Sequence, residues 1–153
     1  MPWFSRKYYR EEDTPTGYRN LESGYALLMH NPLFQQLEGT ILTKASHLNE
    51  KGSIACVFKN GTIHVNTNII LSPEQWYYVL AHNLLHLAFG HFDQDHIPPH
   101  LEFIPELWNK ACDIYITRFL YDIRLGDPFC ADPASDYPIK LNDEQKIYEY
   151  LLT

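Results

Sequence analysis

The segment from residue 72 to residue 90 constrains the fold more than any other part of the chain. It opens with Ser-Pro-Glu-Gln at residues 72–75, where serine suits the N-cap, proline the first helical position and glutamine the N3 position of a capping box. The helix that follows is predicted to run to about Phe89, and Gly90 is typical of a helix C-terminus. Any fold of this chain must therefore accommodate one long helix with both ends specified.

The same helix carries His82 and His86, four residues apart. At about 3.6 residues per turn the two side chains project in nearly the same direction, so both imidazoles can reach one metal ion. Zinc in hydrolases uses such a pair with a third protein ligand and an open position. The alternative is that both histidines are packing residues of a buried helix, and the His-x-x-x-His spacing alone does not decide between the two.

Asn83 occupies the position at which an HExxH motif has its catalytic glutamate. In HExxH hydrolases that glutamate takes a proton from the attacking water and passes it to the leaving amine. An asparagine amide can hydrogen-bond to water, but it has no titratable proton and cannot act as a base. The sequence therefore predicts that the metal ligands are kept and that catalysis is impaired.

His91 is one candidate for the third ligand. It follows His82 by nine residues, which on an unbroken helix is about 900° of rotation and places the two on opposite faces. His91 can return to the metal only if Gly90 breaks the helix. The acidic residues and prolines that follow Gly90 favour such a break.

Asp113 is the other candidate. It lies on a helix predicted from about Glu106 to Tyr121, in a polar stripe of Asn109, Asp113 and Thr117 at i, i+4 and i+8. Asp113 could bind the metal or accept the N–H of a ligating histidine, and Asn109 and Thr117 are candidates for a supporting role around it. A solvated stripe is the alternative, and the sequence leaves the choice between His91 and Asp113 open.

The remaining pattern predicts an α+β fold, with a small sheet or hairpin packed on three to four helices and the histidine-bearing helix at the centre. Asn60-Gly61 between β-rich runs is a strong hairpin signal. Residues 1–15 are predicted to form an extended arm, and residues 16–153 a single domain. The other predicted elements are helices from about Thr16 to Met29 and Leu33 to Thr43, and a final helix from residues 142–145 to the chain end.

Composition narrows the class of function. The chain has 12 Lys and Arg against 19 Asp and Glu, a net charge of −7, which disfavours binding to a phosphate backbone and predicts no nucleic-acid partner. The sequence has neither a signal-peptide core nor an apolar run long enough to cross a membrane, so a cytoplasmic location is expected. Three cysteines without a CxxC pair argue against a disulfide framework and against a cysteine-based zinc site.

Several short blocks follow one another in the order of a known family. The blocks are Asn31-Pro-Leu-Phe, Asn60-Gly61 with the strand through Asn66, Leu71-Ser-Pro-Glu, Leu80-Ala-His-x-x-Leu-His86 with Gly90-His91, Trp108-Asn-x-Ala-Cys-Asp113, and Ile147-Tyr148. With these blocks, over about residues 20–152, the chain resembles the bacterial "putative metallopeptidase" domain that is often joined to a von Willebrand factor A-like domain and encoded beside MoxR-type AAA+ ATPases.

The resemblance implies a zincin-like fold with Zn²⁺ held by His82, His86 and one or both of His91 and Asp113. It also implies that an extended peptide pairs with an exposed strand edge, which here would be the strand with Thr62, His64 and Asn66. A von Willebrand factor A-like domain and a MoxR-type AAA+ ATPase are the implied protein partners. Two positions depart from the family, since Asn83 stands in place of glutamate and Thr117 in place of asparagine.

Three functional hypotheses follow. In the first, the chain binds zinc and a peptide or protein but hydrolyses little, because Asn83 lacks the base. In the second, it is an active zinc peptidase in which Glu102, Glu106 or Asp113 supplies the base. In the third, it is a metal-free interaction module of an ATPase-linked system, and its histidines are packing residues.

Overall fold

The computed structural model describes residues 16–35, 41–44, 54–66, 68–127 and 143–153. These form helices and one small sheet, so the α+β prediction is confirmed. The elements are α1 (Thr16–His30), α2 (Pro32–Gln35), β1 (Ile41–Lys44), β2 (Ala55–Val57), β3 (Thr62–Val65), α4 (Pro73–Ala88), the 3₁₀ turn η3 (Gln94–His96), α5 (Pro105–Asp122) and α6 (Glu144–Leu152).

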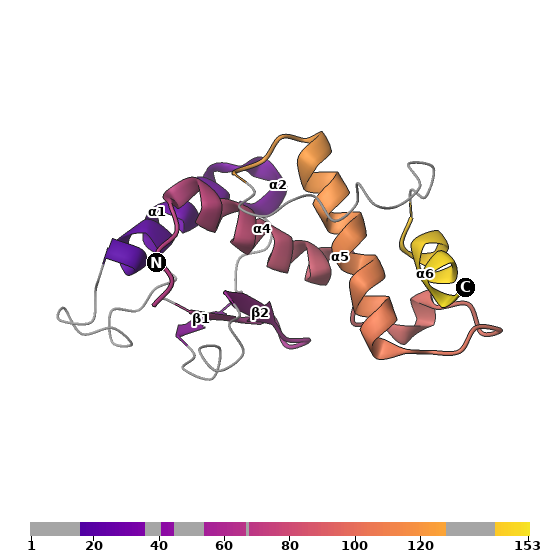
Figure 1. The fold of residues 1–153 in the computed structure, drawn as a ribbon. Coiled ribbons are helices and arrows are strands. Elements are labelled where there is room, and N and C mark those ends of the chain that lie inside the picture. The colour runs from indigo at the N-terminus through magenta and orange to yellow at the C-terminus, as the bar shows by residue number, and fades with distance from the viewer. Residues whose placement is uncertain (1–15, 36–40, 45–53, 67, 128–142) are drawn as a thin grey trace. The chain divides into compact units, whose positions relative to one another are not determined.

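The chain divides into two compact units, and the division falls inside α4. The first unit comprises Met1–Leu84 with Gly126–Phe129, and the second Leu85–Leu125 with Cys130–Thr153. Figure 1 shows α4 as one uninterrupted helix. Residues four apart on α4 therefore keep helical geometry even where the division runs between them.

In the first unit, α1 approaches the start of α4 very closely. A Cβ atom at Gly24 would lie 2.5 Å from Cβ of Trp76 and 2.7 Å from the backbone oxygen of Pro73, so glycine is required there for steric reasons. Trp76 is fully buried by this approach. The predicted helix from Thr16 is confirmed, with its end at His30, and apolar residues on it, including Leu21, form part of the core.

The sheet has the strand order β1-β3-β2, with β2 antiparallel and β1 parallel to β3. The predicted hairpin is confirmed: Gly61 has φ of +90°, and the side chain of Asn60 accepts a hydrogen bond from the Thr62 amide at 3.0 Å. Burial alternates along β3, because Ile63 and Val65 are buried while Thr62 and His64 are half-buried.

The first correction concerns β1. The helix predicted from about Leu33 to Thr43 is wrong at its end: α2 is Pro32–Gln35, residues 36–40 lie outside the described residues, and Ile41–Lys44 is a strand. The β-branched residues of this run suit a strand, and its partner, Thr62–Val65, lies about twenty positions further along the chain, in register Ile41↔Thr62. A pattern within the segment could not reveal that partner.

The second correction follows from the first. The strand with Thr62, His64 and Asn66 was expected to offer a free edge to a peptide, but β3 is the central strand of the sheet. In the described residues the outer strands are β1 and β2. Asn66 is buried, and its side chain accepts a hydrogen bond from the Asn68 amide at 3.1 Å, so it shapes the turn after β3.

The start of α4 forms as predicted. The Gln75 amide donates to Oγ of Ser72 at 3.1 Å, and the Ser72 amide donates to Oε1 of Gln75 at 3.0 Å, which is a reciprocal capping box. At the other end Gly90 has φ of +69°, a left-handed conformation that favours glycine and ends the helix.

The second unit is built around α5 and α6, which lie side by side in Figure 1. Trp108, Ala111 and Ile114 of α5 pack with Ile147 and Tyr148 of α6 in one buried cluster. Both helices begin and end within about two residues of their predicted bounds. This cluster anchors the N-terminus of α6 beside the segment that follows α4.

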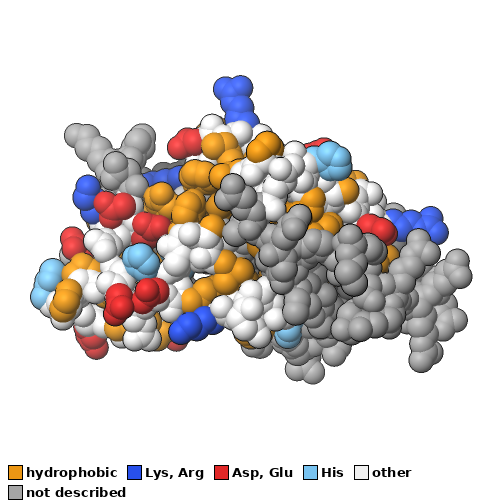
Figure 2. Space-filling view, turned by 180° about the vertical axis from the view of Figure 1, so that it is seen from behind, with side chains coloured by type: hydrophobic (Ala, Val, Ile, Leu, Met, Phe, Trp, Pro, Cys, Tyr) orange, Lys and Arg blue, Asp and Glu red, His pale blue; other side chains and the backbone are white. Residues whose placement is uncertain are grey.

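On the face shown in Figure 2, acidic and basic side chains are interspersed with hydrophobic ones, and the basic side chains lie apart from one another. None of the described helices is long and apolar enough to cross a bilayer. The predicted arm at residues 1–15 lies outside the described residues, as does Cys130.

Candidate metal centre

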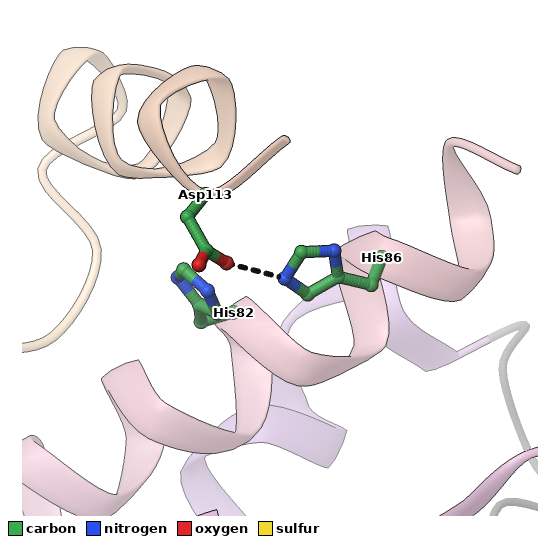
Figure 3. Close-up of side chains that lie close together, drawn as sticks. All are labelled: His82, His86 and Asp113. Atoms are coloured by element: carbon green, nitrogen blue, oxygen red, sulfur yellow. Dashed lines mark hydrogen bonds and ion pairs between the residues drawn. The ribbon is translucent and has the colours of Figure 1, made fainter. Parts of the chain in front are cut away.

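Two histidines of α4 and one aspartate of α5 form a group that could hold a metal ion. One ligand atom from each of His82, His86 and Asp113 can be chosen so that all three lie within 4.8 Å of one another. Figure 3 shows the three side chains pointing toward one another. The group contains two imidazole nitrogens and a carboxylate oxygen, which are donor types that zinc uses.

The positions of the two histidines follow from the helix that carries them. His82 and His86 are one turn apart on α4, and both are half-buried, with the side chain of His86 14% exposed. The ring of His82 lies beside that of Tyr78, with centroids 6.5 Å apart. The metal-ligand spacing predicted from the sequence is therefore present as a pair of rings on one helical face.

Asp113 meets His86 directly. Nε2 of His86 and Oδ1 of Asp113 are 2.8 Å apart, and the Asp113 side chain is 52% exposed. Asn109, one turn earlier on α5, is exposed, whereas Thr117, one turn later, is buried. The predicted stripe thus runs from solvent into the protein, and the supporting roles of Asn109 and Thr117 stay predictions.

His91 lies behind His86. Gly90 breaks the helix, as the sequence required for any return of His91, and the His91 amide then donates to the carbonyl of His86 at 3.0 Å. The Nδ1 atoms of the two rings share a hydrogen bond of 3.1 Å. His91 therefore contacts the ring nitrogen of His86 opposite the one that faces Asp113, and it is not in the group with His82 and Asp113.

His91 is held firmly in this place. Its side chain is 4% exposed, and its ring makes an edge contact with Trp108. Nε1 of Trp108 donates to the backbone carbonyl of His91 at 2.9 Å. On its outer side, Nε2 of His91 donates to Oε1 of Glu144 at 2.8 Å.

Glu144 was not predicted as a site residue. The sequence marks it only as part of the cap of the final helix, and it lies 53 positions after His91. Burial, the largest single effect, raises the pKa of the Glu144 carboxyl, but the hydrogen bond from His91, a backbone hydrogen bond and the charge interaction with His91 together outweigh it, and the net pKa is below its ordinary value. Glu144 is therefore an ionised acceptor at neutral pH, and no local sequence signal could have linked it to His91.

The four side chains form one linear chain of hydrogen bonds, from Asp113 through His86 and His91 to Glu144. Its two ends are carboxylates, which accept only, so its three hydrogen bonds require three N–H groups. Two neutral imidazoles supply one N–H each. The chain of contacts is therefore complete only with one additional cation, which is either a proton on an imidazole or a metal ion between His86 and Asp113.

The surroundings carry a negative potential. Burial, followed by the nearby carboxylates of Glu144 and Asp113, raises the pKa of the Cys112 thiol far above its ordinary value. Burial, then Glu144 and Asp143, also raises the pKa of Tyr115. A negative potential favours a cation, and the protonated, buried Cys112 is a packing residue rather than a competing ligand.

Asn83 is buried and bonded to its own helix. Asn83 is 7% exposed, and Nδ2 of its side chain donates to the Val79 carbonyl at 2.8 Å. Of the other carboxylates considered as bases, Glu102 and Glu106 are exposed, and neither joins His82 and His86 in the metal-holding group. Asp113 is a member of that group.

Comparison with known families agrees with this geometry. The family model described as "Putative metallopeptidase domain" matches residues 32–137, which include α4 and α5. Neither the comparison with curated proteins nor the comparison with solved structures found a match.

Proposed function

Because this chain belongs to the "Putative metallopeptidase domain" family, we propose that it binds one zinc ion through His82, His86 and Asp113. The observation that carries the proposal is the convergence of these three ligand atoms to within 4.8 Å of one another. In a tetrahedral zinc site with bonds of about 2.0–2.1 Å, ligand atoms lie about 3.3 Å apart, so small side-chain rotations suffice. The family description implies a metal, and the choice of zinc rests on the donor types.

Three protein ligands would leave one position of a tetrahedral ion open, which is the arrangement of catalytic rather than structural zinc. Zinc bound there would supply Lewis acidity to a peptide carbonyl. Asp113 is preferred over His91 as third ligand, because His91 already contacts Nδ1 of His86 and donates to Glu144. That the metal centre is of the zincin type is part of this proposal.

We further propose that the chain hydrolyses peptides poorly. Asn83 cannot act as a base, and its amide is engaged by the Val79 carbonyl. Neither Glu102 nor Glu106 joins the group that could hold the metal, and nothing in their placement favours the hypothesis that they supply the base. The function best supported is binding of an extended peptide or protein segment at a zinc centre with residual or no hydrolysis.

A bound peptide would add to an outer strand of the sheet, which means β1 or β2 rather than β3. The cytoplasmic location, and the von Willebrand factor A-like and MoxR-type partners, stay predictions that rest on the sequence and on the resemblance.

The first test is the metal content of the untagged protein after dialysis against zinc at neutral pH, measured by elemental analysis. We expect one zinc per chain in the unaltered protein and loss of that zinc in His86→Ala. The matched control is His100→Ala, which removes an exposed histidine outside the group. An unaltered protein without zinc would favour the metal-free interaction module instead.

The second test restores the base. Asn83→Glu is expected to gain peptidase activity on a broad peptide panel, because a positioned general base contributes about 10²–10⁴-fold. Asn83→Gln introduces a side chain of the same size as glutamate but without a carboxylate, and it should stay inactive. Phenanthroline should abolish any activity of the glutamate variant. Activity of the unaltered protein equal to that of Asn83→Glu would instead support an active peptidase with another base.

A further inference from the structure

Glu144, at the first turn of α6, lies outside the family match and contacts His91, which in turn contacts His86 of the candidate centre. The match ends at residue 137, so nothing known of the matched region accounts for Glu144. It is joined to His86 through His91, by contacts of 2.8 Å and 3.1 Å. Besides its negative charge, Glu144 can therefore act on the centre through the protonation pattern of these two rings.

That pattern has one solution when an ion occupies Nε2 of His86. A carboxylate only accepts, so Glu144 requires the N–H of a neutral His91 to lie on Nε2, which leaves Nδ1 of His91 as an acceptor. The hydrogen bond between the two Nδ1 atoms then requires the N–H of His86 to lie on its Nδ1. The lone pair of His86 is consequently at Nε2, the nitrogen that faces Asp113.

We infer that Glu144 is a positioning residue for the metal centre, which through His91 fixes the His86 tautomer that presents Nε2 to the ion. Metal-ligating histidines generally donate their other N–H to a group that fixes ring orientation and raises ligand basicity. Here that group is a second imidazole, and Glu144 makes it an acceptor. The inference rests on the proposed zinc site.

The geometry around the two rings is rigid enough for such control. His91 is buried against Trp108, and α6 is packed on α5 through Ile147 and Tyr148. Glu144 is half-buried, and its lowered pKa keeps it ionised at neutral pH. The Glu144 carboxylate is therefore an acceptor throughout the neutral pH range, and α6 holds it at the end of the chain of hydrogen bonds.

The test is zinc affinity at pH 7.5, measured by competition with a chromophoric chelator on the full chain. Glu144→Leu removes the acceptor and is expected to weaken zinc binding about 10–100-fold, the range for lost partners of metal ligands. Glu144→Gln has the same length and keeps an oxygen acceptor, so it should restore most of the affinity. Nitrogen-15 NMR of the zinc-loaded protein should show the Nδ1–H tautomer of His86 in the unaltered protein and in Glu144→Gln.

The control for a merely structural role is Asp143→Ala. Asp143 caps α6 by accepting from the Lys146 amide at 2.7 Å, and its loss should lower the melting temperature but leave the zinc affinity unchanged. Equal weakening of zinc binding in Asp143→Ala and Glu144→Leu would overturn the inference, as would unchanged affinity in Glu144→Leu. An unaltered protein that binds no zinc would overturn the zinc proposal and this inference together, so the two failures are distinguishable.

Discussion

The two sides of the His86 ring differ in their exposure to solvent. On one side Nε2 meets Asp113, whose side chain is 52% exposed. On the other side Nδ1 meets His91, which is 4% exposed and backed by Glu144 at 21%. The first contact is at the surface and the second lies inside the second unit.

This difference separates a replaceable contact from a fixed one. A hydrogen bond or ion pair at an exposed carboxylate contributes little to stability, about 0–1 kcal/mol, because water competes for both partners. An ion can therefore displace the contact between His86 and Asp113 at low cost. Breaking the buried contact would leave a polar nitrogen without a partner, which costs about 1–3 kcal/mol. The structure thus allows an ion to enter from the Asp113 side while the His91 side holds the ring still.

Replacement of His91 should break the buried side and give the largest effect on stability. His91→Ala removes a ring packed against Trp108, leaves Glu144 without its donor and creates a cavity. We expect the free energy of unfolding to fall by about 2–3 kcal/mol, within the range for buried groups. Chemical denaturation of the metal-free protein measures it. His96→Ala, which alters an exposed histidine of the same region, is the control, and an equal loss there would contradict the comparison.

The sequence named His82, His86 and Asp113 as candidate ligands, with His91 as the alternative to Asp113, but it did not point to Glu144. The first three rest on local patterns, either the spacing of four on α4 or the polar stripe on α5. Gly90 likewise predicted the end of α4, after which the chain changes direction at His91. Glu144 could not be reached, because its contact with His91 spans 53 positions and depends on how α6 packs on α5.

In the sheet, too, contacts between neighbouring segments were predictable and contacts between distant segments were not. The hairpin around residues 60–61 was predictable because its turn residues and both strands are neighbours in the chain. The parallel partner β1 was not, because a parallel pair needs a long connection and its strands share no turn signal. The error had a functional consequence, since it left β3 with an apparent free edge.

Replacement of Asp113 should sharpen the comparison by affecting metal and stability differently. Asp113→Asn keeps the size of the side chain but removes the charge that faces His86. We expect zinc affinity to fall about 10-fold or more, as for a lost charged partner, while the stability of the metal-free protein changes by less than about 1 kcal/mol. Chelator competition and denaturation give the two numbers. Asp122→Asn, an exposed change on the same helix, should alter neither.

If Asp113→Asn instead lowered stability as much as His91→Ala, the exposed contact would be part of the packed structure. A change in stability without a change in zinc affinity would place the ion elsewhere. Either result would remove the distinction between the His86–Asp113 contact, which an ion can replace, and the His86–His91 contact, which is fixed by packing.

The smallest expected effect is the pH dependence of stability that Glu144 contributes. Burial, the largest single effect, raises the pKa of Glu144, but the hydrogen bond from His91, a backbone hydrogen bond and the charge interaction with His91 together bring it below the ordinary value of 4.5 in the folded protein. A lowered pKa means that the ionised carboxylate stabilises the fold. That contribution is fully present above about pH 4.5 and is lost as the pH falls through the lowered value. The gap in free energy of unfolding between the unaltered protein and Glu144→Gln should therefore be constant near neutral pH and narrow in acid.

Denaturation of both proteins with a chelator present, from pH 7 down to pH 3, measures this gap, which we expect to stay within about 1 kcal/mol for a half-buried group. Glu149→Gln removes a charge from an exposed position on α6 and serves as the control. A gap that widened in acid would mean that the ionised Glu144 carboxylate destabilises the fold, so that burial outweighs the combined effect of His91 and the backbone hydrogen bond. Because an ionised Glu144 is what makes His91 an acceptor, that result would also remove the physical basis of its control over His86.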